Sequence, residues 1–430
     1  MDQDTILLGE KRPFHIMAKA AGAECNMRCD YCYYLEKDKL YRPSKGPRQP
    51  SPRLSDELLE LYIRQYIEAQ PRQAPVVFTW HGGEALIRPR SFYQRALELQ
   101  QRYGQGRRIE NTLQTNGLLV NEDWCRFFRD HDFLIGLSLD GYQEQHDAYR
   151  RTVGGLPTFE RVMRAVDLMQ RLGVEFNILS TVNTHNADDP EGYYRFMKGI
   201  GVRYIQFTPI VERIDESCAR KANFVEAPYI HASAESREMN GLERVRLAPY
   251  SITPEQWGSF TTGVFDEWIR EDVGEVFVQL FDSTLAGWMG VEPGVCTLGK
   301  VCGHAGVMEH NGDVYSCDHY VYPRYLLGNI RQRSLSEMMN SSEQYRFGRA
   351  KLEGLTKQCL ECEYLFACNG ECPKNRFAQS SDGEWGHNYL CSGYYRFWSH
   401  VAPYMDYMKQ CLLQGLPASQ VMRAHISRDQ

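Results

Sequence analysis

Residues 25–32 read CNMRCDYC and place Cys25, Cys29 and Cys32 in a C-x3-C-x2-C spacing. Three thiolates can hold three irons of a [4Fe–4S] cube and leave the fourth iron open to a small molecule, whereas four cysteines normally tie such a cluster. The alternative is zinc, which needs four ligands in a structural site or three plus water in a catalytic one. The motif follows the first predicted strand, at the end where barrel enzymes place their chemistry.

The first half of the chain alternates β-rich runs with helical patterns. Strands are expected to end near Ala18, Trp80, Gln114, Ser138, Thr181 and Phe207. Between them lie helical stretches at about 55–70, 91–103, 121–131, 158–172 and 190–200. This alternation predicts βαβ units and a parallel sheet. Because six units are fewer than the eight of a closed barrel, we expect an α/β fold with a partly open (β/α)6 barrel.

The chain is long enough for two domains, because its 430 residues exceed what one core usually spans. We expect a barrel domain with its linker at 1–250 and a second domain with a final helix at 251–430. The stretch 213–250 has mixed charges and no clear period, and we interpret it as a connection. Regular periodicity fades from Cys296 onward, as is typical of a domain whose metal ligands replace part of the core.

Composition excludes several classes of protein. The net charge of -6 argues against a nucleic-acid binder. No apolar run approaches the roughly 20 residues of a membrane span, and the start, MDQDTILLGEKRPF, does not resemble a secretory signal. We therefore expect a cytoplasmic protein, in which the 14 cysteines serve as metal ligands or catalytic groups and not as disulfides.

The C-terminal half contains a second group of cysteines with close spacing. Its members are Cys296, Cys302, Cys317, Cys359, Cys362, Cys368, Cys372 and Cys391. Eight is the number that two fully ligated [4Fe–4S] cubes require, and a pair of zinc knuckles is the alternative. The remaining three, Cys125, Cys218 and Cys411, lack this spacing, and we expect Cys125 to belong to the core.

The predicted strands end in small or polar residues, as the rim of an active site requires. Residues 81–84 read HGGE, where two glycines let the backbone approach a ligand closely. Residues 114–117 read QTNG, residues 138–141 read SLDG, and Arg150 follows. An Asn-Gly or Asp-Gly pair usually marks only a turn. Two such pairs at consecutive strand ends indicate a site.

The first cysteine motif resembles the signature of the radical S-adenosylmethionine (SAM) superfamily, in which the amino and carboxylate groups of SAM chelate the open iron. The resemblance implies SAM contacts from Tyr31 and Val211 at the adenine, Gly82, Gly83 and Glu84 at the amino group, Ser138 and Arg150 at the carboxylate and ribose, and Asn116. The sequence departs from the superfamily's Gly-Gly-Glu-Pro motif because Ala85 replaces the proline.

The later cysteines, with Gly312 five residues before Cys317, resemble the SPASM extension of radical SAM enzymes that modify peptides and proteins. The resemblance implies two interleaved ligand sets and, with the first motif, three [4Fe–4S] clusters. A near auxiliary cluster would be held by Cys296, Cys302, Cys317 and Cys372. An outer one would be held by Cys359, Cys362, Cys368 and Cys391.

From about Phe14 to Tyr404 the chain resembles the anaerobic sulfatase-maturating enzymes, in stretches such as WHGGEALI, HDAYRR and NGDVYSCDHYV. These enzymes convert the first residue of a Cys/Ser-x-Pro/Ala-x-Arg motif in a sulfatase precursor into Cα-formylglycine. The resemblance implies a 5′-deoxyadenosyl radical from SAM, Asp318 as the base, and Tyr34 as an active-site tyrosine. It also implies an electron donor such as flavodoxin or ferredoxin.

Two other functions compete with this interpretation. A SPASM enzyme that modifies a ribosomally made peptide would share every cysteine motif, but such enzymes often carry a winged-helix segment that the residues before Phe14 cannot supply. A non-catalytic zinc or electron-transfer module would have no use for the HGGE turn or for Arg150. The preference for Cys or Ser stays open, because both chemistries use the same residues.

Overall fold

The structure, a computed structural model, describes residues 13–41, 53–215, 223–224 and 245–424. Its centre is a ten-stranded sheet in the order β10-β6-β5-β4-β3-β2-β1-β11-β12-β13. Six neighbouring parallel strands form its main part: β1 (His15–Lys19), β2 (Val76–His81), β3 (Ile109–Thr115), β4 (Phe133–Ser138), β5 (Phe176–Val182) and β6 (Tyr204–Pro209). These strands end within two residues of the predicted positions, and the open (β/α)6 arrangement is confirmed.

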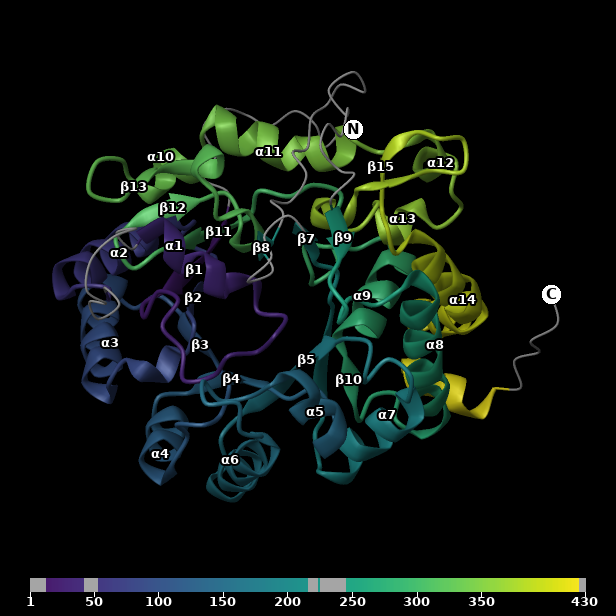
Figure 1. Ribbon diagram of the computed structural model, residues 1–430, viewed down its shortest axis with the longest axis horizontal. Coiled ribbons are helices and arrows are strands. Elements are labelled where there is room, and N and C mark those ends of the chain that lie inside the picture. Colours follow the sequence, from purple (N-terminus) through teal and green to yellow (C-terminus); the bar gives the residue numbers. More distant parts are fainter. Residues whose placement is uncertain (1–12, 42–52, 216–222, 225–244, 425–430) are drawn as a thin grey trace.

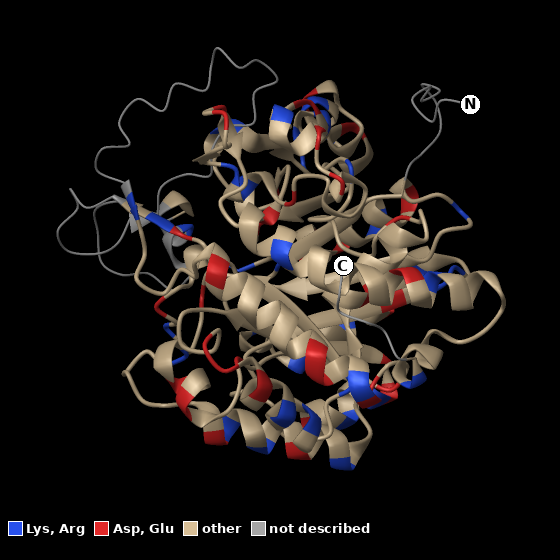
Figure 2. Ribbon diagram, turned by 90° about the vertical axis from the view of Figure 1, so that its right-hand side faces the viewer, with Lys and Arg blue, Asp and Glu red and all other residues tan. Residues whose placement is uncertain are grey.

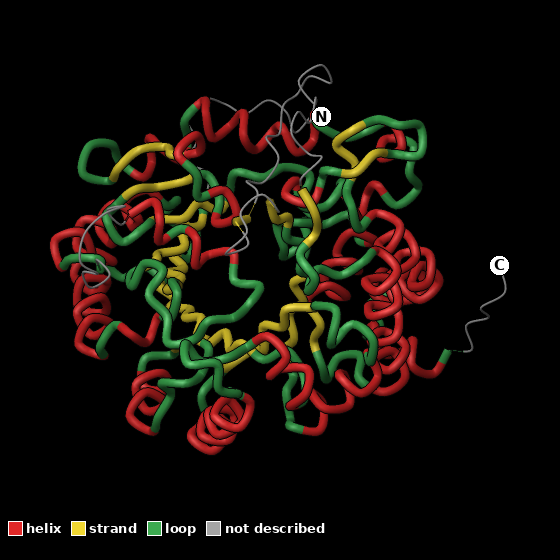
Figure 3. Tube along the Cα trace, in the orientation of Figure 1, coloured by secondary structure: helices red, strands yellow, loops and turns green. Residues whose placement is uncertain are grey.

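Helices cover the outer face of the arc that the strands form (Figures 1 and 3). Those of the first half are α2 (Asp56–Ala69), α3 (Arg90–Gly104), α4 (Glu122–Asp130), α5 (Gln143–Tyr149), α6 (Phe159–Leu172) and α7 (Pro190–Gly199). The short α5 was not expected from the sequence. Ser55 caps α2, because its side chain accepts a hydrogen bond from the Leu58 N–H.

The pattern of β2 shows how the sheet separates its two faces. Val76, Phe78 and Trp80 are fully buried, while Thr79 and His81 on the other face are only partly buried. Phe78 and Trp80 pack edge-on against Tyr62 of α2. Because side chains alternate along a strand, the large aromatic residues fill the core under the helices and the polar ones point into the arc.

The second half of the chain extends both edges of this sheet. β10 (Phe277–Val278) pairs with β6, and β11 (Ala305–Met308) pairs with β1, both in parallel. β12 (Asp313–Tyr315) and β13 (Leu326–Asn329) follow in antiparallel pairing. The later helices are α8 (Pro254–Glu271), α9 (Gln279–Trp288), α10 (Leu335–Met339), α11 (Ser342–Glu353), α12 (Lys357–Leu360), α13 (Leu365–Cys368) and α14 (Cys391–Leu413). The expected domain division at residue 250 stays a prediction.

Most of the stretch interpreted as a connection lies outside the described residues, as does Cys218. Its described ends pair as β7 (Arg213–Asp215) with β8 (Asn223–Phe224) and β9 (Val245–Leu247). On the face turned to the viewer in Figure 2, basic and acidic residues of the outer helices are interspersed. Within the described part of the chain, no helix combines the length and apolar character that a membrane span needs.

Candidate active site

The three cysteines of the first motif lie in the loop that follows β1. Burial raises the pKa of Cys25 to about 12 and raises that of Cys29 well above its usual range, and the Cys32 thiol adds to both shifts. Asn116, which follows β3, donates to Asn26 at 2.7 Å, and its amide nitrogen lies 3.7 Å from the Cys25 Sγ. Buried thiols gathered in this way fit an iron cluster, because metal binding takes the thiolate form and supplies its counter-charge.

Four of the later cysteines gather around a second point: Cys296, Cys302, Cys317 and Cys372. Burial raises the pKa of Cys317 well above its usual range, and the thiols of Cys296, Cys372 and Cys302 raise it further. The four come from the loop before β11, the end of β12 and the loop after α13. The structure thus brings together the residues that the resemblance implies for the near auxiliary cluster.

The other four later cysteines line a cavity of about 550 Å³: Cys359, Cys362, Cys368 and Cys391. Burial raises the pKa of the Cys368 thiol above its usual range, and Cys391 and Cys359 add to this effect. Cys368 and Cys372 are close in sequence but face different sets, as the interleaved arrangement requires. Cys125 is fully buried in the hydrophobic core, as expected.

The HGGE turn after β2 lies against the loop of the first cysteines. The Gly83 N–H donates to the Gly22 carbonyl at 2.7 Å, and the Glu84 N–H donates to the Glu24 carbonyl at 2.8 Å. A Cβ atom on Gly83 would lie 2.2 Å from the Glu24 carbonyl oxygen. The two backbones are in contact here, so only glycine fits at this position.

The Glu84 side chain braces this turn from within. It is 1% exposed, and its carboxylate accepts hydrogen bonds from Thr115 Oγ1 and from the Asn116 N–H, each at 2.8 Å. It also accepts one from the Leu86 N–H at 2.9 Å. Glu84 therefore connects the ends of β2 and β3, and the backbone of the turn is the part that is left to face a ligand.

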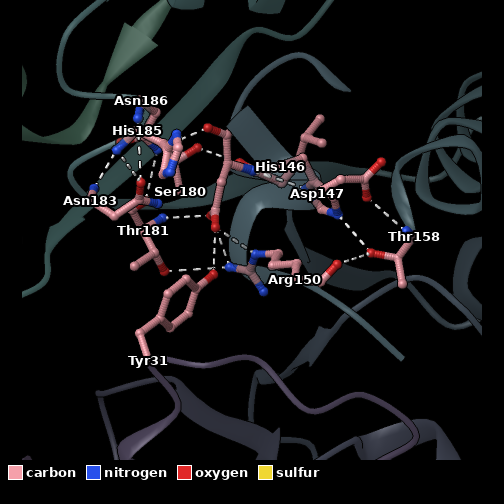
Figure 4. Close-up of polar contacts among 12 residues, drawn as sticks. Tyr31, His146, Asp147, Arg150, Thr158, Ser180, Thr181, Asn183, His185 and Asn186 are labelled. Carbon is pink, nitrogen blue, oxygen red and sulfur yellow. Dashed lines mark hydrogen bonds and ion pairs between the residues drawn. The ribbon is translucent and has the colours of Figure 1, made fainter. Parts of the chain in front are cut away.

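Arg150 lies in a buried ion pair beside Tyr31 (Figure 4). Its Nε lies 2.8 Å from Oδ2 of Asp140, a fully buried residue at the end of β4. The Asp140 carboxylate also accepts hydrogen bonds from the Tyr31 hydroxyl and, at 2.9 Å, from the Thr181 N–H. This network holds the Tyr31 ring 5.5 Å from the Arg150 guanidinium.

The two other expected SAM contacts lie at the same edge of the sheet. Ser138 ends β4 and Val211 follows β6, and both are buried. Because the carboxyl ends of parallel strands meet at one edge, these residues share that edge with the HGGE turn and with Asn116. The expected SAM contacts thus lie at one edge of the sheet, and their role in binding SAM stays a prediction.

Asp318 follows Cys317 directly and lies against the end of β1. Its Oδ1 is 2.8 Å from the Nζ of Lys19, a fully buried lysine, and its Oδ2 accepts a hydrogen bond from the Tyr33 hydroxyl at 2.5 Å. Lys19 also lies 3.0 Å from His81 Nδ1, because the two residues are partners in the β1–β2 register. A lysine, a tyrosine and a histidine from three segments thus surround the expected base.

Tyr34 belongs to the same group of residues. Its hydroxyl donates to the Glu309 carboxylate, and the Lys19 Nζ lies 4.3 Å from the centre of its ring. Both Tyr34 and Glu309 are buried. The structure therefore places Tyr34 beside the partner of Asp318.

Electrostatics keep the Asp318 carboxyl ionised. Burial opposes its ionisation, but the Lys19 ammonium, with smaller contributions from His81 and His319, holds the pKa of Asp318 well below its usual range. Burial lowers the pKa of His81 to about 4, and the charge of Lys19 lowers it further. His81 is therefore neutral near pH 7 and can accept a hydrogen bond from Lys19.

Sequence analysis missed four residues of these two networks: Lys19, Tyr33, Asp140 and His81. Asp140 and His81 belong to the SLDG and HGGE stretches, so their positions at strand ends could have marked them as site residues. Tyr33 stands next to the expected Tyr34 but was not among the expected site residues, and its hydroxyl donates to Asp318. Lys19 ends a strand in a position that nothing in the sequence marks.

Comparison with known proteins agrees with this geometry. The family model described as "Radical SAM superfamily" matches residues 22–197. The SPASM model, described as "Iron-sulfur cluster-binding domain", matches residues 302–363. The chain is 51% identical over 413 residues to a serine-type anaerobic sulfatase-maturating enzyme of Bacteroides thetaiotaomicron, covering 96% of this chain and 95% of that protein. It is 28% identical to a cysteine-type enzyme of Clostridium perfringens, over 91% of this chain and 97% of that protein.

A solved structure of native anSMEcpe with bound AdoMet and Cp18Cys peptide has a similar fold. Its TM-score is 0.76 at 27% identity, and the match covers 93% of this chain and 99% of that one. Identity of 51% across nearly the whole length decides against the two competing functions. The chain therefore belongs to the anaerobic sulfatase-maturating enzymes, radical SAM enzymes with a SPASM iron–sulfur domain that oxidise a serine or cysteine of a sulfatase to formylglycine.

Proposed function

We propose that the preferred target of this enzyme is a serine within a Ser-x-Pro/Ala-x-Arg motif of a sulfatase precursor. The support is the higher identity to the serine-type relative, 51% against 28% for the cysteine-type one. A cysteine target is the second candidate, because the base and the cluster ligands suit either side chain.

The observation that carries the mechanism is the position of Asp318. This carboxylate is ionised by Lys19, oriented by Tyr33, and adjacent in sequence to Cys317. A general base must lie within hydrogen-bond reach of its proton, about 2.6–3.2 Å. We assign Asp318 to remove the proton of the target hydroxyl, next to a ligand of the cluster that would receive the electron.

The chemistry that SAM and the first cluster supply when bound is hydrogen abstraction by a 5′-deoxyadenosyl radical. Cys25, Cys29 and Cys32 would hold that cluster. Around it, Tyr31 and Val211 would contact the adenine, the backbone of Gly82, Gly83 and Glu84 the amino group, and Asn116, Ser138 and Arg150 the rest of SAM. Tyr34 would help to shape the pocket on the side of Asp318.

We assign the eight later cysteines to two further [4Fe–4S] clusters, in the near and outer sets described above. The support is that the thiols of the near set lie close enough to raise the pKa of Cys317, and that the four of the outer set line one cavity. The chain would then carry about twelve irons. A value near four, with zinc present, would contradict the assignment.

The setting of the enzyme follows from the same chemistry. None of the thirteen cysteines that the structure describes forms a disulfide, which fits a reducing cytoplasm. A carrier such as flavodoxin or ferredoxin would supply the electron for SAM cleavage. We place the domain boundary near residue 250, in the interval between the two matched regions, which end at 197 and begin at 302.

The test is an anaerobic assay of the reduced, reconstituted enzyme with SAM and two peptides that differ only in Ser or Cys at the target position. Mass spectrometry follows the peptides, and chromatography follows 5′-deoxyadenosine. We expect the serine peptide to lose two hydrogen atoms, matched by 5′-deoxyadenosine, at a higher rate than the cysteine peptide reacts. Faster reaction of the cysteine peptide would contradict the proposed preference.

A further inference from the structure

Lys351 is a fully buried lysine in α11, close to the near cysteine set. Its Nζ donates to the backbone carbonyl of Cys296 at 3.0 Å and to that of Thr297 at 2.6 Å. Among the residues that the structure describes, no carboxylate forms an ion pair with it. An ammonium removed from water is costly unless an opposite charge accompanies it, and two carbonyl dipoles supply no net charge.

A second buried cation stands in the same place. The Arg376 side chain is 7% exposed, and its guanidinium donates only to backbone carbonyls, those of Gly370, Asn369, Glu371 and Lys351. The neighbouring Glu371 carboxylate accepts instead from the amides of Asn375 and Asn388. Two buried cations therefore stand beside one buried anion, and positive charge is in excess.

The thiols of the near set are the groups that can balance this charge. Lys351 donates to the backbone of Cys296, and its helix accepts from the Cys302 N–H through the Gly348 carbonyl. Arg376 donates to the backbone carbonyls of residues 369–371, directly before Cys372.

We propose that Lys351 is the counterion of the near auxiliary cluster and, through its charge, holds the reduction potential of that cluster above the value it would otherwise have. The proposal rests on the ligand set assigned under the proposed function. A cube held by four thiolates is anionic, and its net charge is one of the quantities that set its potential. A fixed positive charge in a medium of low dielectric stabilises the state with one more electron.

This role suits the second half of the reaction. When the substrate radical at Cβ becomes the aldehyde, one proton leaves from the hydroxyl and one electron leaves with it. Asp318 would take the proton, and the oxidised near cluster would take the electron and be reduced by one unit. Lys351 contacts none of the reacting atoms. It would act indirectly, because its charge sets the potential of the cluster that accepts the electron.

The experiment is a redox titration followed by electron paramagnetic resonance, on chains whose first motif is removed by Cys25→Ala, Cys29→Ala and Cys32→Ala. Lys351→Met should lower the midpoint potential of the near cluster by at least ~59 mV, the one-electron equivalent of a tenfold change in equilibrium constant. The outer cluster should not shift and serves as the internal reference. Lys300→Met removes the same charge from an exposed position two residues before Cys302, and it should shift neither cluster.

Two more variants decide the result if Lys351→Met fails to hold the near cluster. Lys351→Gln keeps N–H donors without the charge, and Lys351→Arg keeps the charge. The proposal is supported if Lys351→Gln lowers the potential of the near cluster. It is also supported if both neutral variants lose that cluster while Lys351→Arg keeps it. An unchanged potential in the neutral variants, or loss of the cluster from all three, overturns it.

The iron content distinguishes failure of the proposed ligand sets from failure of the counterion proposal. If the parent chain without the first motif binds markedly fewer than about eight irons, the two-cluster assignment is wrong whatever Lys351 does. If it binds about eight and the neutral variants titrate like the parent, only the counterion proposal is wrong.

Discussion

Asp318 owes its properties to residues that lie far from it in the chain. Lys19, its ion-pair partner, stands at the end of β1, and Tyr33 follows the first cysteine motif. The number and spacing of the cysteines predicted clusters, while the resemblance implied the two ligand sets and Asp318 as the base. The contact of Lys19 with Asp318 could not be predicted, because it depends on the pairing of β1 with β11, and His81 joins them through the pairing of β1 with β2.

Asp318→Asn removes the base but keeps the size of the side chain. We expect the variant to cleave SAM and to form formylglycine at least about 100-fold more slowly, since general bases contribute about 10² to 10⁴ in rate. Quantifying 5′-deoxyadenosine and modified peptide in the same reaction separates the two steps. Undiminished formylglycine would remove Asp318 from the mechanism.

Lys19→Met leaves the largely buried Asp318 carboxylate, whose side chain is 17% exposed, without its cation. Breaking a buried pair in this way costs about 3–5 kcal/mol, so we expect a lower thermal midpoint together with slow product formation. In the double variant Lys19→Met with Asp318→Asn, the unpaired charge is gone and much of the stability should return. Equal loss of stability with and without Asp318→Asn would show that the pair is not what Lys19 stabilises.

The residues of the site lie at the carboxyl ends of the strands and in the loops that follow them, not within the strands. Alternating apolar and polar residues predicted β1 to β6 closely, and helical patterns with capping residues predicted most of the helices between them. Both succeed because each element depends mainly on its local sequence. The three-stranded β7–β9 sheet and the pairing of β10 with β6 were missed, because strands of two or three residues carry too little periodicity.

Gly83→Ala tests the contact between the HGGE turn and the first cysteine loop. The added Cβ would meet the Glu24 and Ala23 carbonyl oxygens at 2.2 and 2.6 Å, and backbone atoms cannot turn aside. We expect SAM binding, measured by anaerobic calorimetry, to weaken at least tenfold, or about 1.4 kcal/mol. Gly199→Ala is the matched control, since its Cβ would meet no atom within 4 Å. Equal affinity in both variants would contradict the role of this turn.

At the scale of the whole molecule, burial of neutral histidines links stability to pH. The fully buried His146 has its ring nitrogens toward the Asp140 N–H and Thr158 Oγ1. Burial lowers the pKa of His146 to about 4, from about 6.5 in an unfolded chain. Between these values the unfolded chain binds a proton that the folded one does not, so stability falls as pH is lowered through this window.

One such histidine contributes a slope of at most about 1.4 kcal/mol per pH unit. His81 and His319 have pKa values lowered to about 4 by burial and act in the same direction. Asp282, whose pKa burial raises to about 6, acts in the opposite one. We expect His146→Gln to remove one histidine's share, so that its thermal midpoint falls less than that of the parent between about pH 7 and about pH 5.5. If both proteins lose the same amount over this range, His146 is not a source of the acid sensitivity, whatever the substitution does to stability at neutral pH.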